Sequence, residues 1–217
     1  MIIEWLDRID TQCFYWINHH HCVFTDWLMW GASQTWSWLM VLLIFFFVVT
    51  LRYEPKRWWL VLLGIGLCFL LSDRISVLCF KNVVCRLRPC HALEDVVMFK
   101  TSCGGLYGFI SSHAANVFSL AMFLSMRYVH KNGLPRKKKQ NVDGSTPIST
   151  PSNSNWIIPS VIFFWALLVG YSRPYLGKHY PGDILCGALV GIGLGALVFF
   201  LTRKLEVAID HRKQQKV

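Results

Sequence analysis

Three short segments of the sequence combine basic side chains, histidines and hydroxyl groups in a way that suits phosphate chemistry. They read KNVVCRLRP at 81–89, SSH at 111–113 and SRPYLGKHYPGD at 172–183. An arginine fork grips two phosphate oxygens at once, and histidine serves as a nucleophile or proton donor. The segments therefore predict a phosphoryl-transfer site that works with positioned cations. We expect no metal and no other cofactor.

Fixed positive charge is the first requirement of such a site. The first segment supplies Lys81 and Arg88, and the third segment supplies Arg173. Ser111 stands where a helix is predicted to begin, so its hydroxyl and the free backbone N–H groups beside it would face the same anion. These four residues are the candidates for binding phosphate.

Two histidines are available for the covalent and proton-transfer steps, His113 and His179. Asp183 follows His179 by four residues, one turn away if the stretch is helical, and is placed to orient the imidazole. Pro181 suits the first position of the helix that follows. The histidines with Asp183 are the candidate catalytic residues.

The composition predicts that these segments lie at a membrane. Of the 217 residues, 54% are hydrophobic and only 16% are charged, which is too little polar surface for a water-soluble domain of this size. The apolar residues also fall in long blocks. A net charge of +10 does not indicate nucleic acid, because the basic residues cluster in short segments between the apolar runs, where they set membrane topology.

The pattern predicts an all-α integral membrane bundle of one catalytic unit. We expect an N-terminal interfacial helix within 1–26, an embedded domain at 27–203 with a flexible cytoplasmic loop at 130–155, and a basic cytoplasmic tail at 204–217. Five stretches approach the ~20 residues that cross a bilayer. They are Trp27–Thr50, Arg57–Phe80, Ile110–Met126, Trp156–Tyr171 and Ile184–Leu201.

Charge sets the orientation of this bundle. Five spans put the 51–57 turn, the 127–156 loop and the C-terminal tail on one side, and 14 of the 22 Lys and Arg residues fall there. That side is predicted to be cytoplasmic. All three candidate segments then lie on the opposite face, which in a bacterium is the periplasmic face of the inner membrane, and the protein is multi-pass.

The three segments carry a family resemblance. The pattern K-x6-RP, then Ser-x-His, then SR-x5-H-x3-D resembles the type 2 phosphatidic acid phosphatase superfamily of membrane lipid phosphatases, over roughly Ser72 to Leu201. The second segment departs from the common Pro-Ser-Gly-His form, with Ile110 for the proline and Ser112 for the glycine. Because Ser112 keeps its backbone N–H, we expect a change in loop stiffness and retained activity.

The resemblance implies a role for each matching residue. His179 would attack phosphorus and form a phosphohistidine, with Asp183 as its partner, while His113 would protonate the leaving oxygen and later activate water. The resemblance implies that phosphate is bound by Lys81, Arg88, Ser111, the Ser112 backbone and Arg173.

The resemblance implies that the substrate is a lipid phosphate in the bilayer, either a phospholipid or an isoprenoid phosphate. The segments RLRPCH and CGGLYGFISSHAAN are similar to envelope phosphatases of the Bacteroides group, which implies lipid A or undecaprenyl pyrophosphate, with phosphatidylglycerol phosphate behind them. A lipid phosphotransferase would use the same site. A vanadium haloperoxidase shares this site too, but those relatives are soluble. A non-enzymatic transporter should carry polar residues along a path through the bilayer, whereas most of the polar residues in the predicted spans gather at one face. The sequence does not indicate an oligomeric state.

Other polar residues stay outside the predicted site. His19, His20 and His21 are consecutive, so they cannot easily converge on one metal ion. Cys90 and Cys103 flank the loop between the first two segments, and whether they form a disulfide is left open. Asp73 and Arg74, inside the second predicted span, are interpreted as an internal ion pair or as support for the site.

Overall fold

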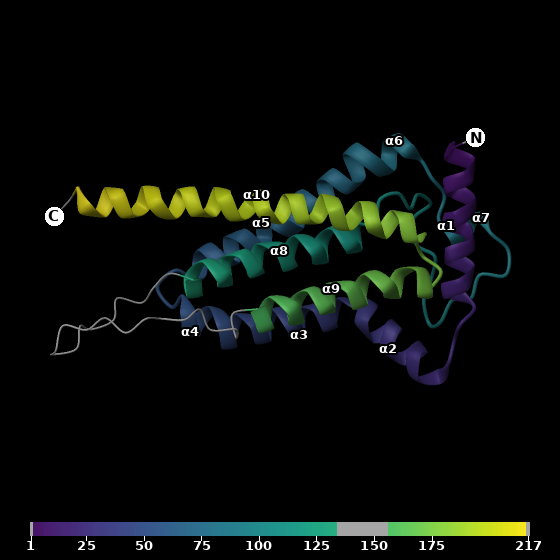
Figure 1. The fold of residues 1–217 in the computed structure, drawn as a ribbon, viewed down its shortest axis with the longest axis horizontal. Helices are drawn as coiled ribbons and strands as arrows, with labels where there is room; N and C mark the ends of the chain where they lie inside the picture. Colours follow the sequence, from purple (N-terminus) through teal and green to yellow (C-terminus); the bar gives the residue numbers. More distant parts are fainter. Residues whose placement is uncertain (1, 134–155, 216–217) are drawn as a thin grey trace.

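A computed structural model describes residues 2–133 and 156–215 of the chain, and in these residues it contains helices and no β-strand (Figure 1). The predicted all-α fold is confirmed, and the predicted 130–155 loop lies almost wholly outside the described residues. The helices are α1 (Ile2–Asn18), α2 (Val23–Ser33), α3 (Thr35–Phe45), π-helical η1 (Phe46–Thr50), α4 (Leu51–Tyr53), α5 (Trp58–Ile75), π-helical η2 (Ser76–Lys81), α6 (Asn82–Val84), α7 (Pro89–Ala92), α8 (Ser112–Gly133), α9 (Ile157–Tyr175) and α10 (Pro181–Gln214).

The long helices α5, α8, α9 and α10 run side by side, and α1 crosses one end of the bundle (Figure 1). At that end α5 continues into η2 and α6, α8 and α10 begin, and α9 finishes. We call it the site end. The C-terminus lies at the opposite end, because α10 continues as one helix to Gln214.

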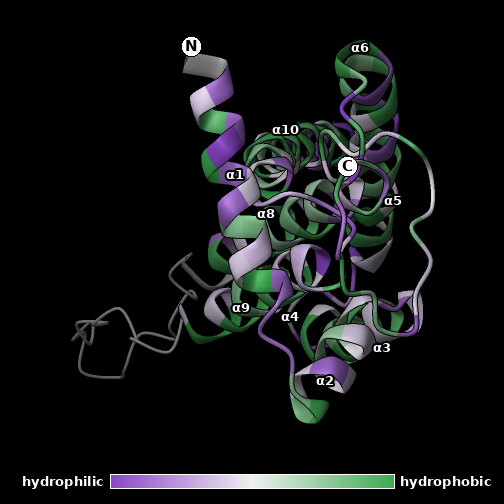
Figure 2. Cartoon of the chain, turned by 90° about the vertical axis from the view of Figure 1, so that its right-hand side faces the viewer, coloured by the Kyte–Doolittle hydropathy of each residue, from purple (hydrophilic) through white to green (hydrophobic). Residues whose placement is uncertain are grey.

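Within the described residues, three helical stretches are long and apolar enough to cross a membrane, namely Trp58–Val84, Ile157–Tyr175 and Pro181–Gln214. Hydrophobic residues dominate these helices, whereas α1 alternates between hydrophilic and hydrophobic positions (Figure 2). A fourth crossing is possible if Val23–Ser33 and Thr35–Thr50 act together. The predicted count of five spans is not confirmed, although α8 is helical where the third span was predicted.

The stretch predicted as one span, Trp27–Thr50, contains a bend, because Val23–Ser33 and Thr35–Thr50 meet at 68°. Gln34 adopts extended backbone (φ −79°, ψ 144°) between them, and the Ser37 hydroxyl donates a 2.7 Å hydrogen bond to the Gln34 carbonyl. Local side-chain hydrogen bonds of this kind replace helical ones. The bend turns Ser33 and Trp38 toward the site end.

Helix α8 is the centre of the bundle and contacts α5, α9 and α10. Ala114, Ala115, Ala121 and Phe123 are fully buried within it. Because the surrounding helices cover α8, its serines Ser112, Ser119 and Ser125 are buried, and this part of the helix tolerates a polarity that a lipid-exposed span does not.

Small residues let α8 and α10 approach backbone to backbone. Gly187, Gly191 and Gly195 repeat every four residues on the face of α10 that meets α8, as in close-packed membrane helix pairs. A Cβ at Gly191 would lie 2.4 Å from the Ala115 carbonyl oxygen. This close contact fixes the start of α10 against the start of α8.

The opposite end is held by buried ion pairs. Arg127 of α8 bonds to Glu54 through two nitrogens, at 3.0 and 2.5 Å, and lies 3.4 Å from Glu206 of α10. Arg57 also pairs with Glu206, at 3.2 Å. Two of the arginines that the sequence analysis assigned to membrane topology therefore also tie three helices together.

The glycine contact makes a stability prediction. Gly191→Ala should destabilise the fold by about 1–3 kcal/mol, because the new methyl group overlaps the α8 backbone. Gly193→Ala is the matched control, since a Cβ there meets nothing within 4 Å and alanine favours the helix. Thermal unfolding in detergent, followed by tryptophan fluorescence, compares the two. Equal melting temperatures would contradict the packing described here.

Candidate active site

The candidate site lies at the site end, where the three predicted segments meet. The Lys81 ammonium, at the end of η2, donates a 2.8 Å hydrogen bond to the Ser112 hydroxyl in the first turn of α8. Lys81 therefore reaches the second segment directly. The π turn changes the angle at which Lys81 leaves the helix, and such turns often occur at functional sites.

Ser111 joins the second segment to the third. Its backbone N–H donates to the Asp183 carbonyl at 3.1 Å, and its hydroxyl accepts the Ala114 N–H at 3.3 Å. Ser111 is fully buried and caps α8. The Ser111 carbonyl also accepts the Ala115 N–H, which is the first intrahelical hydrogen bond of α8.

The two predicted arginines reach the site from different elements. Arg173, on the last turns of α9, is almost entirely buried and donates to the Ser33 hydroxyl. Arg88, in the loop before α7, donates to the Cys103 carbonyl at 3.3 Å. In each guanidinium Nε is buried, and no described residue accepts its hydrogen. Both arginines therefore keep donors for an anion.

His179 and Asp183, which the sequence predicts to be a catalytic pair, lie next to each other, although His179 precedes α10 and is not in a helix. The His179 Nδ1 lies 3.4 Å from an Asp183 carboxylate oxygen, and both side chains are buried. The other fixed contact of that oxygen is the Tyr180 N–H at 3.1 Å, which caps α10. Pro181 begins α10, as predicted. Catalytic hydrogen bonds are often long before substrate binds.

Burial lowers the pKa of His179 well below its ordinary value, and the positive charges of Arg173, Arg88 and Lys81 lower it further. His179 is thus neutral at pH 7. His179 Nδ1 faces Asp183 at 3.4 Å and has no hydrogen-bond partner among the described residues.

His113 lies one residue into α8, and its ring meets the edge of Trp38 with the centroids 5.1 Å apart. Arg173, His179 and Lys178 interact with His113 electrostatically. Sequence reasoning missed Trp38 and Ser33. Their position depends on the bend at Gln34. In the sequence, only the polar residues at 33–37 indicated a break in the helix there.

Arg86 is a second residue that the sequence analysis left without a role. Its guanidinium lies 3.1 Å from Asp183 and 2.7 Å from Asp10 of α1. It also stacks 3.8 Å from the centre of the Tyr180 ring. Asp10 in turn accepts the Gly182 N–H at 2.7 Å. This chain of contacts links α1 to the carboxylate behind His179.

Lys178, immediately before His179, is the third missed residue. Burial lowers the pKa of Lys178 to about 8, with the charges of Arg173 and Arg88 adding to the effect. It is a fourth cation beside the predicted three. The signal was its place inside the most specific segment, SRPYLGKHYPGD.

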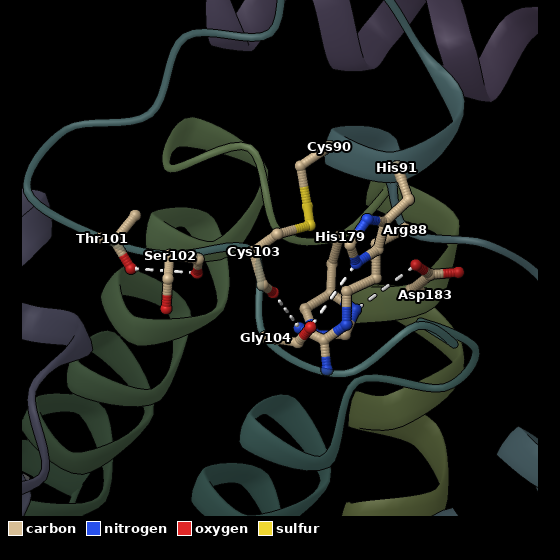
Figure 3. The surroundings of a disulfide bond; sticks show 9 residues. All are labelled: Arg88, Cys90, His91, Thr101, Ser102, Cys103, Gly104, His179 and Asp183. Carbon is tan, nitrogen blue, oxygen red and sulfur yellow. Dashed lines mark hydrogen bonds and ion pairs between the residues drawn. A yellow bond between two sulfur atoms is a disulfide. The ribbon is translucent and has the colours of Figure 1, made fainter.

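Cys90 and Cys103 form a disulfide, the alternative that the sequence left open. Figure 3 shows Arg88, His179 and Asp183 grouped beside it. The bond joins the two ends of the 90–103 loop and holds the Cys103 carbonyl that Arg88 contacts. The three N-terminal histidines contact separate partners: Asp95 for His19, Trp16 for His20 and Asp26 for His21.

Curated relatives match nearly the whole chain. A lipid A 4′-phosphatase of Bacteroides thetaiotaomicron is 29% identical over 213 residues, covering 96% of this chain and 84% of that protein. A lipid A 4′-phosphatase of Porphyromonas gingivalis is 28% identical over 200 residues, covering 91% and 74%.

Solved structures share the fold. A transmembrane PAP2-type phosphatidylglycerolphosphate phosphatase of Bacillus subtilis aligns with a TM-score of 0.62 and 21% identity, over 94% of this chain and 87% of that one. LpxE of Aquifex aeolicus aligns with a TM-score of 0.54 and 24% identity, over 87% and 93%. The profile of the PAP2 superfamily matches residues 58–206. This chain belongs to the PAP2 superfamily.

Proposed function

We propose that this PAP2 membrane phosphatase removes a phosphate monoester from lipid A through a phosphohistidine on His179. The observation that carries the proposal is the buried His179 beside Asp183, close to Arg88 and Arg173, whose Nε donors are not used by any described residue. A buried nucleophile needs such cations because moving a phosphate dianion from water into a low-dielectric site costs much free energy unless positive charges pair with it.

The reaction has two balanced steps. In the first, the free ring nitrogen of His179 attacks phosphorus, the bond from phosphorus to the sugar oxygen breaks, and His113 gives that oxygen a proton. In the second, His113 takes a proton from water, the resulting oxygen attacks phosphorus, and the phosphorus–nitrogen bond breaks. Phosphate leaves and both histidines return to their starting states.

Binding falls to the cations and the start of α8. Lys81, Arg88 and Arg173 carry three positive charges against the two negative charges of the phosphate, so their mutual repulsion is relieved when it enters. Ser111 and the Ser112 N–H would hold the equatorial oxygens as charge redistributes in the transition state.

The names of the curated relatives favour lipid A as the substrate. The two curated relatives are named lipid A 4′-phosphatases, which favours a monoester on a sugar headgroup over undecaprenyl pyrophosphate. The periplasmic face of the inner membrane is supported by the excess of Lys and Arg at the opposite end. Trp5, Leu6, Ile9 and Trp16 of α1 are exposed apolar residues, consistent with a helix lying along the membrane surface at the site end.

The central test is phosphate release by the purified protein from lipid A, undecaprenyl pyrophosphate and phosphatidylglycerol phosphate. Release from lipid A should fall at least about a thousandfold in His179→Ala, with the fold retained in detergent, and mass spectrometry of the product identifies which phosphate is lost. EDTA should leave the rate unchanged, because side-chain cations supply the charge. Activity surviving in His179→Ala would remove the nucleophile, and transfer of phosphate to an acceptor lipid would make the protein a phosphotransferase.

A second prediction concerns Arg86. Arg86→Ala should lower kcat about 10- to 100-fold, since it removes a charged hydrogen bond behind the His179–Asp183 pair. KM should change little, because Arg86 is engaged by carboxylates. Asp10→Asn keeps an acceptor for the Gly182 N–H and should give a smaller fall, and Arg8→Ala, an exposed arginine of α1, is the control. A rise in KM with unchanged kcat would contradict the positioning role.

A third prediction is the pH dependence set by Lys178. Its pKa of about 8 means that the charged form, which binds phosphate, is present below pH 8 and is lost as the pH rises. The phosphate itself stays dianionic over this range. KM should therefore rise about two- to fivefold between pH 7 and 9, and Lys178→Gln should abolish the rise. Lys204→Gln, at the opposite end, is the control, and a rise that persists in Lys178→Gln would assign it to another group.

A further inference from the structure

A groove outside the catalytic site carries unpaired polar groups within the membrane-spanning part of the bundle. It has a volume of about 460 Å³ and lies along the seam between α5 and α8. It is lined by Gly66, Phe69, Leu70, Asp73, Arg74 and Asn116. Asp73 and Arg74 belong to the stretch Trp58–Val84, which is otherwise apolar enough to cross a membrane.

The expected ion pair between Asp73 and Arg74 does not form. Both side chains are exposed on the bundle surface, and among the described residues neither has a hydrogen bond or ion pair. The Asn116 side-chain oxygen is buried, and no described residue donates to it. Charged and polar groups in such a position are costly unless something pairs with them.

The groove leads to the phosphate-binding end. Asn116 follows Ser112 by four residues on the same face of α8, about 6 Å along the helix, and Ser112 accepts the hydrogen bond from Lys81. Asp73 precedes Lys81 by eight residues, about 12 Å, and its charge acts on Lys81. The groove and the candidate catalytic site therefore lie along the same contact between α8 and the helix formed by α5 and η2, with the groove farther from the site end.

The depth of Asn116 below Ser112 matches the depth of the acyl linkages below the phosphate of a lipid. The interfacial layer of each leaflet is roughly 6 Å thick, so a lipid held by its phosphate at Lys81 has its acyl linkages below Lys81, in the direction of the groove. Those linkages contain amide, ester and hydroxyl groups. Arg74 donates to carbonyls, Asp73 accepts from hydroxyl or amide groups, and Asn116 does both.

We propose that this groove, formed by Asp73, Arg74 and Asn116 on a floor opened by Gly66, binds the acyl-linkage region of the lipid substrate. The inference rests on the proposed function and adds to it a second contact for the same lipid. The phosphate is held at the site end, and the linkage groups are held one to two helical turns deeper, so the lipid enters from the side of the bilayer with its phosphate already aligned.

Glycine supplies a test that leaves every charge in place. A Cβ at Gly66 meets nothing within 4 Å, so Gly66→Leu fills the groove without disturbing the core. Gly193 of α10 is equally open and exposed, which makes Gly193→Leu the matched control. Arg74→Gln then removes the charge and keeps much of the side-chain volume.

The experiment compares lipid A with p-nitrophenyl phosphate, a soluble monoester without acyl chains. Arg74→Gln should raise KM for the lipid about tenfold, because a charge-assisted hydrogen bond is lost. Gly66→Leu should raise KM by a similar factor, because the leucine fills the groove. Both variants should leave kinetics on p-nitrophenyl phosphate within twofold of wild type. Gly193→Leu should match wild type on both substrates.

Two results would overturn the inference. Unchanged lipid kinetics in both groove variants would mean that the substrate does not occupy the groove. Equal losses on both substrates would mean that the groove supports the fold or holds a resident phospholipid. If wild-type protein released no phosphate from lipid A but hydrolysed p-nitrophenyl phosphate, the proposed substrate would fail instead, and the groove comparison would be repeated with the lipid that is hydrolysed.

Discussion

The backbone contact between α8 and α10 determines where every catalytic group can lie. Glycines on α10 bring it against the Ser111 and Ala115 carbonyls, and the Ser111 N–H bonds to the Asp183 carbonyl. The second and third segments are therefore joined through the backbone, and side-chain flexibility cannot separate them. Lys81 then attaches the first segment to the same point through Ser112. A rigid frame of this kind is what phosphoryl transfer demands, since catalysis rests on positioning and charge.

Like charges have to be held together inside this frame. Four cations repel one another here and are partly or almost fully buried, which lowers the free energy of unfolding. They are Lys81, Arg88, Arg173 and Lys178. Arg86 balances part of that charge through Asp10 and Asp183, and Ser33 and the Cys103 carbonyl hold two of the arginines by neutral contacts. In the proposed mechanism, the arginine Nε donors that no described residue engages would bind the phosphate anion.

Much of this site could be predicted from sequence, because its residues fall in three segments with fixed internal spacing. Lys81, Ser111, Arg173, His179 and Asp183 occupy one end of the bundle, and the helix beginning at Pro181 follows from local rules for helix starts. The bend at Gln34 could not be predicted, since its local signal is weak within an apolar stretch. The link from Asp10 to Arg86 and Asp183 joins residues up to 173 positions apart, and no local pattern specifies such a pairing. The Cys90–Cys103 bond remained open for the same reason: spacing permits it, and only the path of the loop decides it.

The account depends most on His179 as the nucleophile, and a direct measurement is to trap the covalent intermediate. Protein mixed with lipid A carrying labelled phosphate is quenched within milliseconds in alkali, which preserves phosphohistidine, then digested and analysed by mass spectrometry. The proposed mechanism predicts label on the peptide that contains His179. Full turnover in the wild-type protein with no label on His179 at any time, or with label on His113, would contradict it.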